Sequence, residues 1–294
     1  MCQNIFIPES IIEKWNSLTF KDNFIFTKVM QEPELCRHTL ELLLGIKIKK
    51  LEYPKSEFFF KESFDSRGIR LDVYTKDDEH CFDIEMQTTN NTNLLKRARY
   101  YSSCIDVDEL QSGKDFSELK ENIIIFLCLK DPFNKGLPVY TFTTKCSESP
   151  ELPDDETRKI FYNISCWKKN KNEGIRNFLE FIKTNIPKDT FTKQLEHHAE
   201  KALQNVDIRR QFMTLEMELR SRYKEGLERG EMLGLKKGKA EGIHTAKLEA
   251  AVIAVKDFNI PVETVAKKYG ISAEMIRKQL SDFTCLQKGQ QKNN

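Results

Sequence analysis

The stretch 70–87 constrains the fold of this chain more than any other part of the sequence. Polar and apolar residues alternate over 70–75 and again over 81–87, which is the period of a half-buried β-strand. A four-residue loop at 77–80 closes two such strands into a hairpin. The sequence therefore predicts an antiparallel pair of strands with one polar and one apolar face.

The polar face of this hairpin carries two acids opposite each other. The register that the loop sets puts Asp72 directly across from Glu85, and Arg70 across from Gln87. Facing residues have Cβ atoms about 4.5–5.5 Å apart, and like charges placed in this way destabilise a sheet. Asp72 and Glu85 therefore need a shared proton or a divalent cation, and we interpret them as a candidate metal site. Asp83 shares their face, and we interpret it as structural.

The chain has 294 residues, 39% of them apolar, which is enough for one large domain and a smaller one. No run approaches the roughly 18 apolar residues of a membrane-spanning helix, so we expect no membrane partner. The first residues lack a basic region followed by an apolar stretch, so we expect no secretory signal. Eight cysteines without a Cys-x-x-Cys pair favour small buried side chains over a disulfide or zinc framework. We therefore expect a cytoplasmic protein.

Hydrophobic periodicity predicts an order of helices and strands that indicates a mixed α/β core. The expected helices cover 18–31, 32–44, 94–110, 174–186, 193–205 and a long stretch from 207. Besides the hairpin, the expected strands cover 47–53, 57–61, 122–129, 139–144 and 159–164, and a turn region covers 88–93. The run 122–129 is continuously apolar, which favours a strand buried on both faces, whereas 47–53 and 57–61 are polar and suit an edge.

Glycine recurs at every fourth position of a polar helical stretch, at Gly226, Gly230, Gly234, Gly238 and Gly242. Each glycine costs a helix about 1 kcal/mol relative to alanine. Two interpretations stay open: a ridge of small residues that lets two helices approach closely across a homodimer, and a flexible linker. We therefore expect three parts, namely a domain over 1–205, a linker or dimerisation segment over 206–244, and a small helical unit over 245–294.

The last third of the chain is basic. Residues 201–294 contain 18 Lys and Arg against 12 Asp and Glu, a balance of +6, while the rest contains 29 against 33, a balance of −4. A basic tail on a mildly acidic body points weakly to a nucleic-acid partner, and a solvated helical tail is the alternative.

The unit over 245–294 has the pattern of three short helices, at 245–258, 261–269 and 272–280. Gly270 fits a tight turn and Ser272 is a good helix cap. The predicted shared core consists of Val262, Val265, Ile271, Ile276 and Leu280. The arrangement resembles a helix-turn-helix, in which Arg277 and Lys278 of the last helix would reach DNA. Because Glu274 would repel phosphate, a plain three-helix oligomerisation unit is the alternative.

The two facing acids of the hairpin suit phosphodiester chemistry. Mg²⁺ prefers oxygen ligands, takes one or two protein carboxylates and keeps several waters. In this arrangement Asp72 and Glu85 would hold the ion, and the backbone carbonyl of Met86 could add a neutral ligand. The ion would lower the pKa of a water and offset charge on the phosphate, and Gln87 could orient the attacking water by hydrogen bonding.

Several blocks of the sequence resemble one known family. They are Asp22-Asn-Phe-Ile-Phe-Thr-Lys-Val-Met-Gln, Arg70-Leu-Asp72-Val, Asp83-Ile-Glu85-Met-Gln87, Arg97-x-x-x-Tyr101-Tyr-Ser, Asp131-Pro-Phe-x-x-Gly-Leu-Pro-x-Tyr-x-Phe and Lys159-Ile-Phe-Tyr-Asn163. With these blocks the chain resembles the Rpn-type recombination-promoting nucleases, or PD-(D/E)XK nuclease family transposases, over roughly residues 18–215. The spacing from Asp72 through Glu85 to Gln87 is similar to the branch that has glutamine in place of the usual lysine.

The resemblance implies a restriction-endonuclease-like PD-(D/E)XK core, with a mixed central sheet flanked by helices, to which this chain adds an all-α C-terminal extension. It implies a Mg²⁺-dependent DNA endonuclease associated with mobile-element recombination, with Mn²⁺ as a substitute ion. The implied catalytic residues are Asp72, Glu85, Gln87 and Asp22, and the acids are the implied metal ligands. The alternative role of Asp22 is a helix-capping arrangement with Thr19.

Arg97 and Tyr101 lie one turn apart on a predicted helix, where they can hold a phosphate or brace a carboxylate. Core packing is the alternative for Tyr101. The resemblance also implies association with the nucleoid when DNA is bound, and one site per chain favours a homodimer for cutting both strands. The second hypothesis is a catalytically silent DNA-binding or assembly protein, because Gln87 cannot supply the positive charge of a lysine.

Overall fold

The computed structural model describes the backbone of residues 7–60, 69–89 and 92–290, and the side chains of these residues except 56–60 and 282–290. Lys61 of a predicted strand and residues 90 and 91 of the predicted turn lie outside the described residues. The chain divides into two compact units, Met1–Glu216 and Met217–Asn294. Within the described part, no helix combines the length and hydrophobicity needed to cross a membrane.

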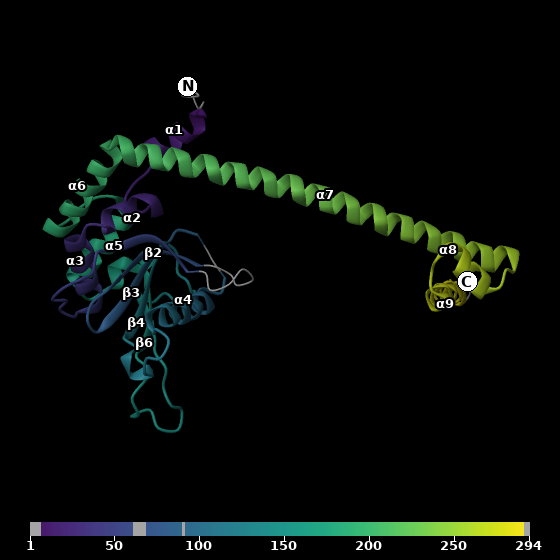
Figure 1. Cartoon of the computed structure of the whole chain (residues 1–294), viewed down its shortest axis with the longest axis horizontal. Coiled ribbons are helices and arrows are strands. Elements are labelled where there is room, and N and C mark those ends of the chain that lie inside the picture. Colours follow the sequence, from purple (N-terminus) through teal and green to yellow (C-terminus); the bar gives the residue numbers. More distant parts are fainter. Residues whose placement is uncertain (1–6, 61–68, 90–91, 291–294) are drawn as a thin grey trace. The chain divides into compact units, whose positions relative to one another are not determined.

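A six-stranded mixed sheet, in the order β1-β2-β3-β4-β6-β5, is the centre of the first unit (Figure 1). The strands are β1 Lys55–Phe60, β2 Ile69–Lys76, β3 His80–Gln87, β4 Glu121–Cys128, β5 Val139–Phe142 and β6 Thr157–Asn163. Antiparallel pairing joins β1 to β2 and β2 to β3, β4 runs parallel to both β3 and β6, and β5 is antiparallel to β6 at the far edge. The predicted mixed α/β core and the antiparallel hairpin are confirmed. The prediction that the hairpin strands are half-buried is wrong, because both faces of β2 and β3 are covered.

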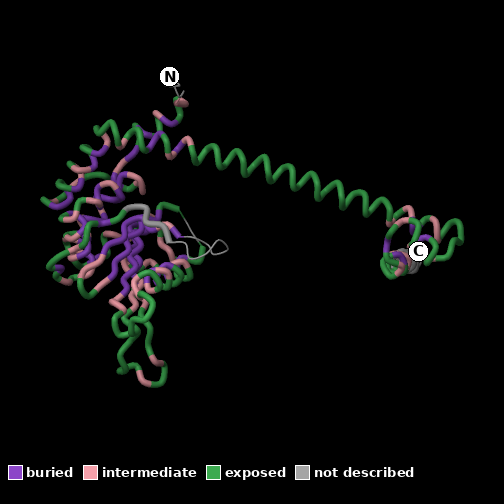
Figure 2. The backbone as a smooth tube through the Cα atoms, viewed as in Figure 1, coloured by how far each residue is buried: buried purple, intermediate pink, exposed green. Residues whose placement is uncertain are grey.

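Strand β4 lies in the middle of the sheet, and seven of its eight residues are buried (Figure 2). Its continuous apolar run therefore has the double-sided burial that the sequence predicts. Strand β1 is at an edge, also as predicted. The strand predicted at 47–53 is wrong. Single hydrogen bonds join this segment to the end of β2, among them one from the Glu52 amide to the Lys76 carbonyl (2.8 Å). They do not form the continuous ladder of a β-strand.

The other elements of the first unit are helices. They are α1 Glu9–Asn16, α2 Asn23–Met30, α3 Pro33–Leu44, α4 Leu94–Glu109, α5 Glu173–Thr184 and α6 Thr190–Gln204, with short 3-10 helices η1 Phe116–Glu118 and η2 Ile164–Lys169. Helices α3 to α6 match predicted helices to within a few residues, α2 is shorter than its predicted 18–31, and α1 was not predicted. Figure 1 shows α4 and the helices α3 and α5 on opposite sides of the strands.

The two sides of the sheet have separate apolar cores. On the α4 side, Ala98, Tyr101 and Ile105 pack with residues of β3 and β4 such as Cys81 and Phe126. The second core is aromatic, with Phe20 contacting Phe26, Phe178 and Phe181 at ring-centroid distances of 5.6, 6.5 and 5.2 Å. These contacts fix α2 and α5 together, and α2 also contacts β1, β2 and β3.

Helix α7, Val206–Phe258, contains all five regularly spaced glycines. At each glycine, no atom other than the neighbouring backbone of α7 itself lies within 4 Å of the place where a Cβ would sit. The segment is therefore helical, and among the described residues no close contact requires glycine there. Whether it serves as a linker or as a dimerisation surface stays a prediction.

The second unit contains the predicted small helical core. The end of α7, α8 Val262–Tyr269 and α9 Ala273–Gln290 surround a cluster that includes all five residues predicted for it. Gly270 ends α8 with φ 67°, a conformation that favours glycine, and the Met275 amide donates to Ser272 Oγ over 3.2 Å. The predicted helix at 245–258 is the last part of α7.

Candidate active site

The two acids of the hairpin face each other as the sequence predicts. Strands β2 and β3 pair with Val73 opposite Ile84, and the same register puts Asp72 opposite Glu85. The Asp72 amide donates to Glu85 Oε1 over 2.9 Å, and the Met86 amide donates to Asp72 Oδ2 over 3.2 Å. The backbone of each strand therefore holds the carboxylate of the other.

Both acids are buried, and their ionised forms are disfavoured. Asp72 is 4% exposed and Glu85 is 1% exposed. Burial raises the pKa of Asp72 above its usual value. Burial, followed by the charge of Asp72, raises the pKa of Glu85 to about 8. Two ionised carboxylates at this place require a nearby cation.

Arg97 of α4 is the cation in direct contact with Glu85. Its Nη2 forms an ion pair with Glu85 Oε2, and its Nη1 donates to Gln87 Oε1 over 3.0 Å. Its Nε donates to the hydroxyl of Tyr101 over 2.6 Å, and the guanidinium lies 4.9 Å from the Tyr101 ring centroid and 5.2 Å from that of Phe126. Of the two roles expected for Arg97, the structure therefore has the one in which it braces a carboxylate.

The residue of α2 that contacts Asp72 is Asn23, whose amide donates to Asp72 Oδ1 over 2.8 Å. The carboxylate of Asp22 accepts hydrogen bonds from the Thr19 amide (2.7 Å) and hydroxyl (3.0 Å) instead. Throughout the described residues, no group of three or more His, Cys, Asp or Glu side chains is placed to hold a metal ion. Asp22 is thus not brought together with Asp72 and Glu85, and its contacts are those of the alternative role with Thr19.

Sequence reasoning missed Asn23. The available signal was its position beside Asp22, at the start of a helix whose buried residues are mostly apolar, namely Ile25, Phe26, Val29 and Met30. An amide at that position has to find a polar partner or solvent. Its partner became visible only with α2 packed against β2.

Both the oxygen and the nitrogen of the Gln87 side-chain amide form hydrogen bonds. Its Oε1 accepts from Arg97, and its Nε2 donates to the carbonyl (2.7 Å) and hydroxyl (3.1 Å) of Thr89. Its side chain can orient a water only by exchanging one of these partners. The water-positioning role of Gln87 stays a prediction.

Asp83 is a third acid on the same face. It is fully buried, and neither of its carboxylate oxygens has a hydrogen-bond partner. Burial, and then the charges of Glu85 and Asp72, raise its pKa well above the usual range. Its burial without a hydrogen-bond partner therefore favours the neutral form over the ionised one.

The pair of buried, facing carboxylates is the observation that fits a divalent metal. Asp72 and Glu85 offer carboxylate oxygens, the ligands that Mg²⁺ prefers. Two protein carboxylates are enough for an ion that takes the rest of its coordination from water. The carbonyl ligand expected from Met86 stays a prediction.

A cavity of about 750 Å³ opens beside Asp72. Its lining residues are Asn23, Ile69, Arg70, Asp72, Thr92, Asn93, Lys96, Arg97, Tyr100 and Tyr101. A smaller cavity of about 250 Å³ lies beside Gln87 and includes Lys130. Basic side chains next to buried acids are suited to a phosphate-bearing ligand whose backbone approaches the acids.

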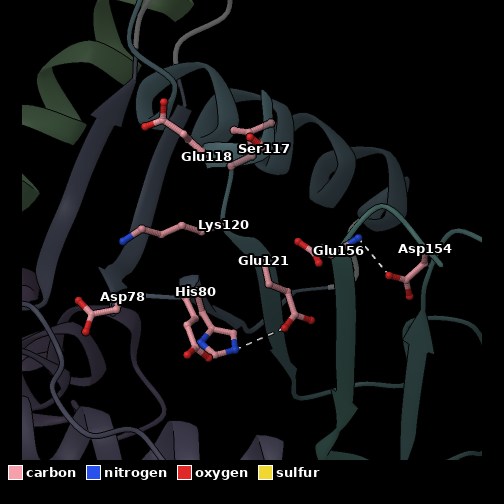
Figure 3. Close-up of a pocket in the computed structure, with 10 residues that line it drawn as sticks. Asp78, His80, Ser117, Glu118, Lys120, Glu121, Asp154 and Glu156 are labelled. Atoms are coloured by element: carbon pink, nitrogen blue, oxygen red, sulfur yellow. Dashed lines mark hydrogen bonds and ion pairs between the residues drawn. The ribbon is translucent and has the colours of Figure 1, made fainter. Parts of the chain in front are cut away.

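A separate pocket of about 600 Å³ lies at the opposite ends of the same strands (Figure 3). His80 and Glu121 are the first residues of β3 and β4, and the distance from His80 Nε2 to Glu121 Oε2 is 3.4 Å. Asp78, Glu118 and Asp154 are among the acids around it. Glu85 and Gln87 are near the carboxyl end of β3, so this acidic pocket is distinct from the candidate site.

In the second unit, the two residues expected to reach DNA differ in their surroundings. Arg277 forms an ion pair with Glu263 of α8. Lys278 is exposed. DNA contact by either residue stays a prediction, and the structure makes Glu263 a competitor for Arg277.

One family model matches the chain, that of the PD-(D/E)XK nuclease family transposases, over residues 24–229. The matched residues include Asp72, Glu85, Gln87 and Arg97, and begin just after Asp22 and Asn23. No match was found among curated proteins or among solved structures. The match covers well over half of the chain and agrees with the mixed sheet and flanking helices. The chain therefore belongs to the PD-(D/E)XK nuclease family transposases.

Proposed function

We propose that the protein is a Mg²⁺-dependent DNA endonuclease of the recombination-promoting type, with Asp72 and Glu85 as its metal ligands. Membership in the family supports a nuclease- or transposase-type function. The observation that carries the finer proposal is the pair of buried, facing carboxylates on β2 and β3, each bonded to the backbone of the other strand.

The residues of this chain have distinct tasks in the proposed reaction. Hydrogen bonds from Asn23 and from the Met86 amide orient Asp72. When bound, the ion would lower the pKa of a water and offset the charge that builds on the phosphate. Arg70 and Lys96 line the cavity and attract the DNA backbone. Gln87 orients the attacking water once its amide is released from a present partner.

The second unit is proposed to add DNA affinity. Its three-helix core and basic last helix suit contact with the phosphate backbone through Lys278. Self-association through α7 would bring two sites to one duplex. Mn²⁺ is expected to support cleavage in place of Mg²⁺. The location proposed for the protein is the cytoplasm, on the nucleoid when DNA is bound.

A second candidate function is a catalytically silent DNA-binding protein. The observation that favours it is the set of contacts that occupy Glu85 and Gln87, because Arg97 binds both side chains and Thr89 binds the other end of Gln87. A site closed in this way with metal and DNA present would not cut. The two functions differ in one measurable respect, which is cleavage.

The test is nicking of supercoiled plasmid in Mg²⁺, with and without EDTA. We expect cleavage by the wild type, none in EDTA, and a loss of about 10²-fold or more for Asp72→Asn and Glu85→Gln. Asp78→Asn, in the exposed hairpin loop, is the matched control and should cleave like the wild type. Undiminished cleavage by both site variants would refute the proposal, and DNA binding without cleavage would favour the silent alternative.

A further inference from the structure

The contacts of Arg97 point to a role that goes beyond bracing. We infer that Arg97 is an exchangeable counter-ion: it occupies Glu85 while the metal is absent, and is released toward the substrate phosphate when the metal binds. This inference rests on the proposed function, because it requires a divalent cation at Asp72 and Glu85. It assigns to Arg97 the positive charge that Gln87 does not carry.

The first step of the argument is the occupancy of the Glu85 carboxylate. Its Oε1 accepts the Asp72 amide over 2.9 Å, a bond between neighbouring strands that is kept as long as the hairpin is folded. Its Oε2 is bound to Arg97. A metal ion held by Glu85 therefore meets the charge of Arg97 at the same carboxylate.

Two cations on one buried carboxylate oxygen repel each other. The Glu85 side chain is only 2% exposed, so water screens this repulsion poorly. A divalent ion carries two charges and can bind Asp72 directly, whereas among the described contacts Arg97 acts on Asp72 through its charge without a hydrogen bond. The metal therefore gains more from the two acids than Arg97 does, and Arg97 is the group that leaves.

Arg97 has anchors that do not involve Glu85. Its Nε remains on the Tyr101 hydroxyl, its Nη1 remains on Gln87 Oε1, and its guanidinium stays against the rings of Tyr101 and Phe126. The side chain is 30% exposed and lines the 750 Å³ cavity with Lys96. Release from Glu85 therefore frees an Nη2 donor without removing the charge from the cavity.

A guanidinium fork with one end free is well suited to a phosphate oxygen. The structure thus supplies a positive charge beside Gln87 from another element, α4. A purely structural Arg97 would stay on Glu85 under all conditions and would orient it for the metal. The two roles predict opposite effects of removing Arg97 on the binding of Mg²⁺.

The experiment is calorimetric titration of the full chain with Mg²⁺, without DNA, for the wild type, Arg97→Gln, Arg97→Lys and Arg99→Gln. Arg99 is an exposed arginine on the same helix and provides the matched control. We expect Arg97→Gln to bind Mg²⁺ about fivefold or more tightly, the lower range of coupling between two sites. Arg97→Lys keeps the charge but not the forked contacts, so its Mg²⁺ affinity should lie between those of the wild type and Arg97→Gln.

Arg97→Gln should cleave DNA more slowly although it binds Mg²⁺ more tightly, because it lacks the charge that meets the phosphate. A structural defect would lower both the cleavage rate and the Mg²⁺ affinity. Equal or weaker Mg²⁺ binding by Arg97→Gln, with the wild type binding normally, overturns the inference and leaves the proposed function in place. A wild type that binds no Mg²⁺ overturns both.

A crystal structure of the wild type with Mg²⁺ keeps the inference testable if Arg97→Gln does not fold. We expect the ion at Asp72 and Glu85, with Arg97 off Glu85 Oε2 but still bonded to Tyr101. A structure in which the ion and Arg97 both remain on Glu85 Oε2 overturns the inference.

Discussion

The side-chain amide of Asn23 donates a hydrogen bond to Oδ1 of Asp72 over 2.8 Å, across 49 positions of the chain. It connects the first turn of α2 to the acid at the centre of the candidate site. With the Met86 amide on Oδ2, both oxygens of Asp72 have a hydrogen-bond donor. The orientation of Asp72 therefore depends on a helix as well as on the hairpin.

Removing this bond should weaken the site without removing a metal ligand. We expect Asn23→Ala to lower Mg²⁺ affinity and cleavage about 10- to 100-fold, the usual effect of losing a hydrogen bond to a ligand. The Asn23 bond lowers the pKa of Asp72, so its loss should also shift the pH profile of cleavage upward. Calorimetry and a plasmid assay between pH 6 and about 9 measure both effects. An unchanged profile and affinity would show that the contact is incidental.

Asp22 should behave differently from its neighbour. Its carboxylate accepts two hydrogen bonds from Thr19, so Asp22→Asn should cost about 1 kcal/mol of stability. We expect Mg²⁺ affinity to stay within about threefold of the wild type. Urea unfolding and calorimetry measure these quantities. A loss of metal binding as large as that of Glu85→Gln would instead make Asp22 a ligand.

The metal-free protein should become less stable as the pH rises. Glu85 binds its proton more tightly in the folded protein, where its pKa is about 8, than in the unfolded chain, where it is close to 4.5. The free energy of unfolding therefore falls between these two values. We expect urea midpoints measured in EDTA to fall across this window, and Mg²⁺ to restore them because the cation replaces the proton. In Glu85→Gln the fall should be smaller, because only Asp72 and Asp83 then bind their protons more tightly in the folded protein. An equal fall would place its origin in those two acids.

DNA binding by the second unit should depend on Lys278 and on the release of Arg277. We expect Lys278→Ala to weaken binding to any DNA sequence and to reduce the slope of log affinity against log salt by about 1. Glu263→Gln should strengthen binding, because it frees Arg277 from its ion pair. Fluorescence anisotropy over a range of salt concentrations measures both. If neither variant changes the affinity, α9 does not contact DNA.

The glycines of α7 should be replaceable without loss of stability. Gly230→Ala and Gly234→Ala place a methyl group in open space and should each stabilise the helix by about 1 kcal/mol. Circular dichroism during urea unfolding measures this gain. Sedimentation velocity on the same variants separates the two interpretations, since a dimer packed through the glycines dissociates when they are enlarged. If the variants are less stable and the sedimenting mass does not change, both the expected stabilisation and the dimer packed through the glycines are contradicted.

Sequence alone determined the features that depend on neighbouring residues. Alternation and a short loop specify the register of a hairpin, so the sequence is enough to set Asp72 opposite Glu85. The continuous apolar run of β4 likewise predicts a strand that is covered on both faces, which is the burial that β4 has in the middle of the sheet. The polar segment 47–53 has the local pattern of a strand but is not one, because no local pattern shows that a ladder partner is missing.

Tertiary structure decided which side chains meet the two acids. Asn23 reaches Asp72 because aromatic packing around Phe20 fixes α2, and α2 contacts β2. Arg97 reaches Glu85 because α4 lies on the face that carries the acids. The sequence identified Arg97 as a candidate but left its partner open, and it pointed to Asp22 where Asn23 makes the contact. The physical reason is that register follows from bonds between adjacent strands, whereas contacts between distant elements follow from how their apolar faces pack.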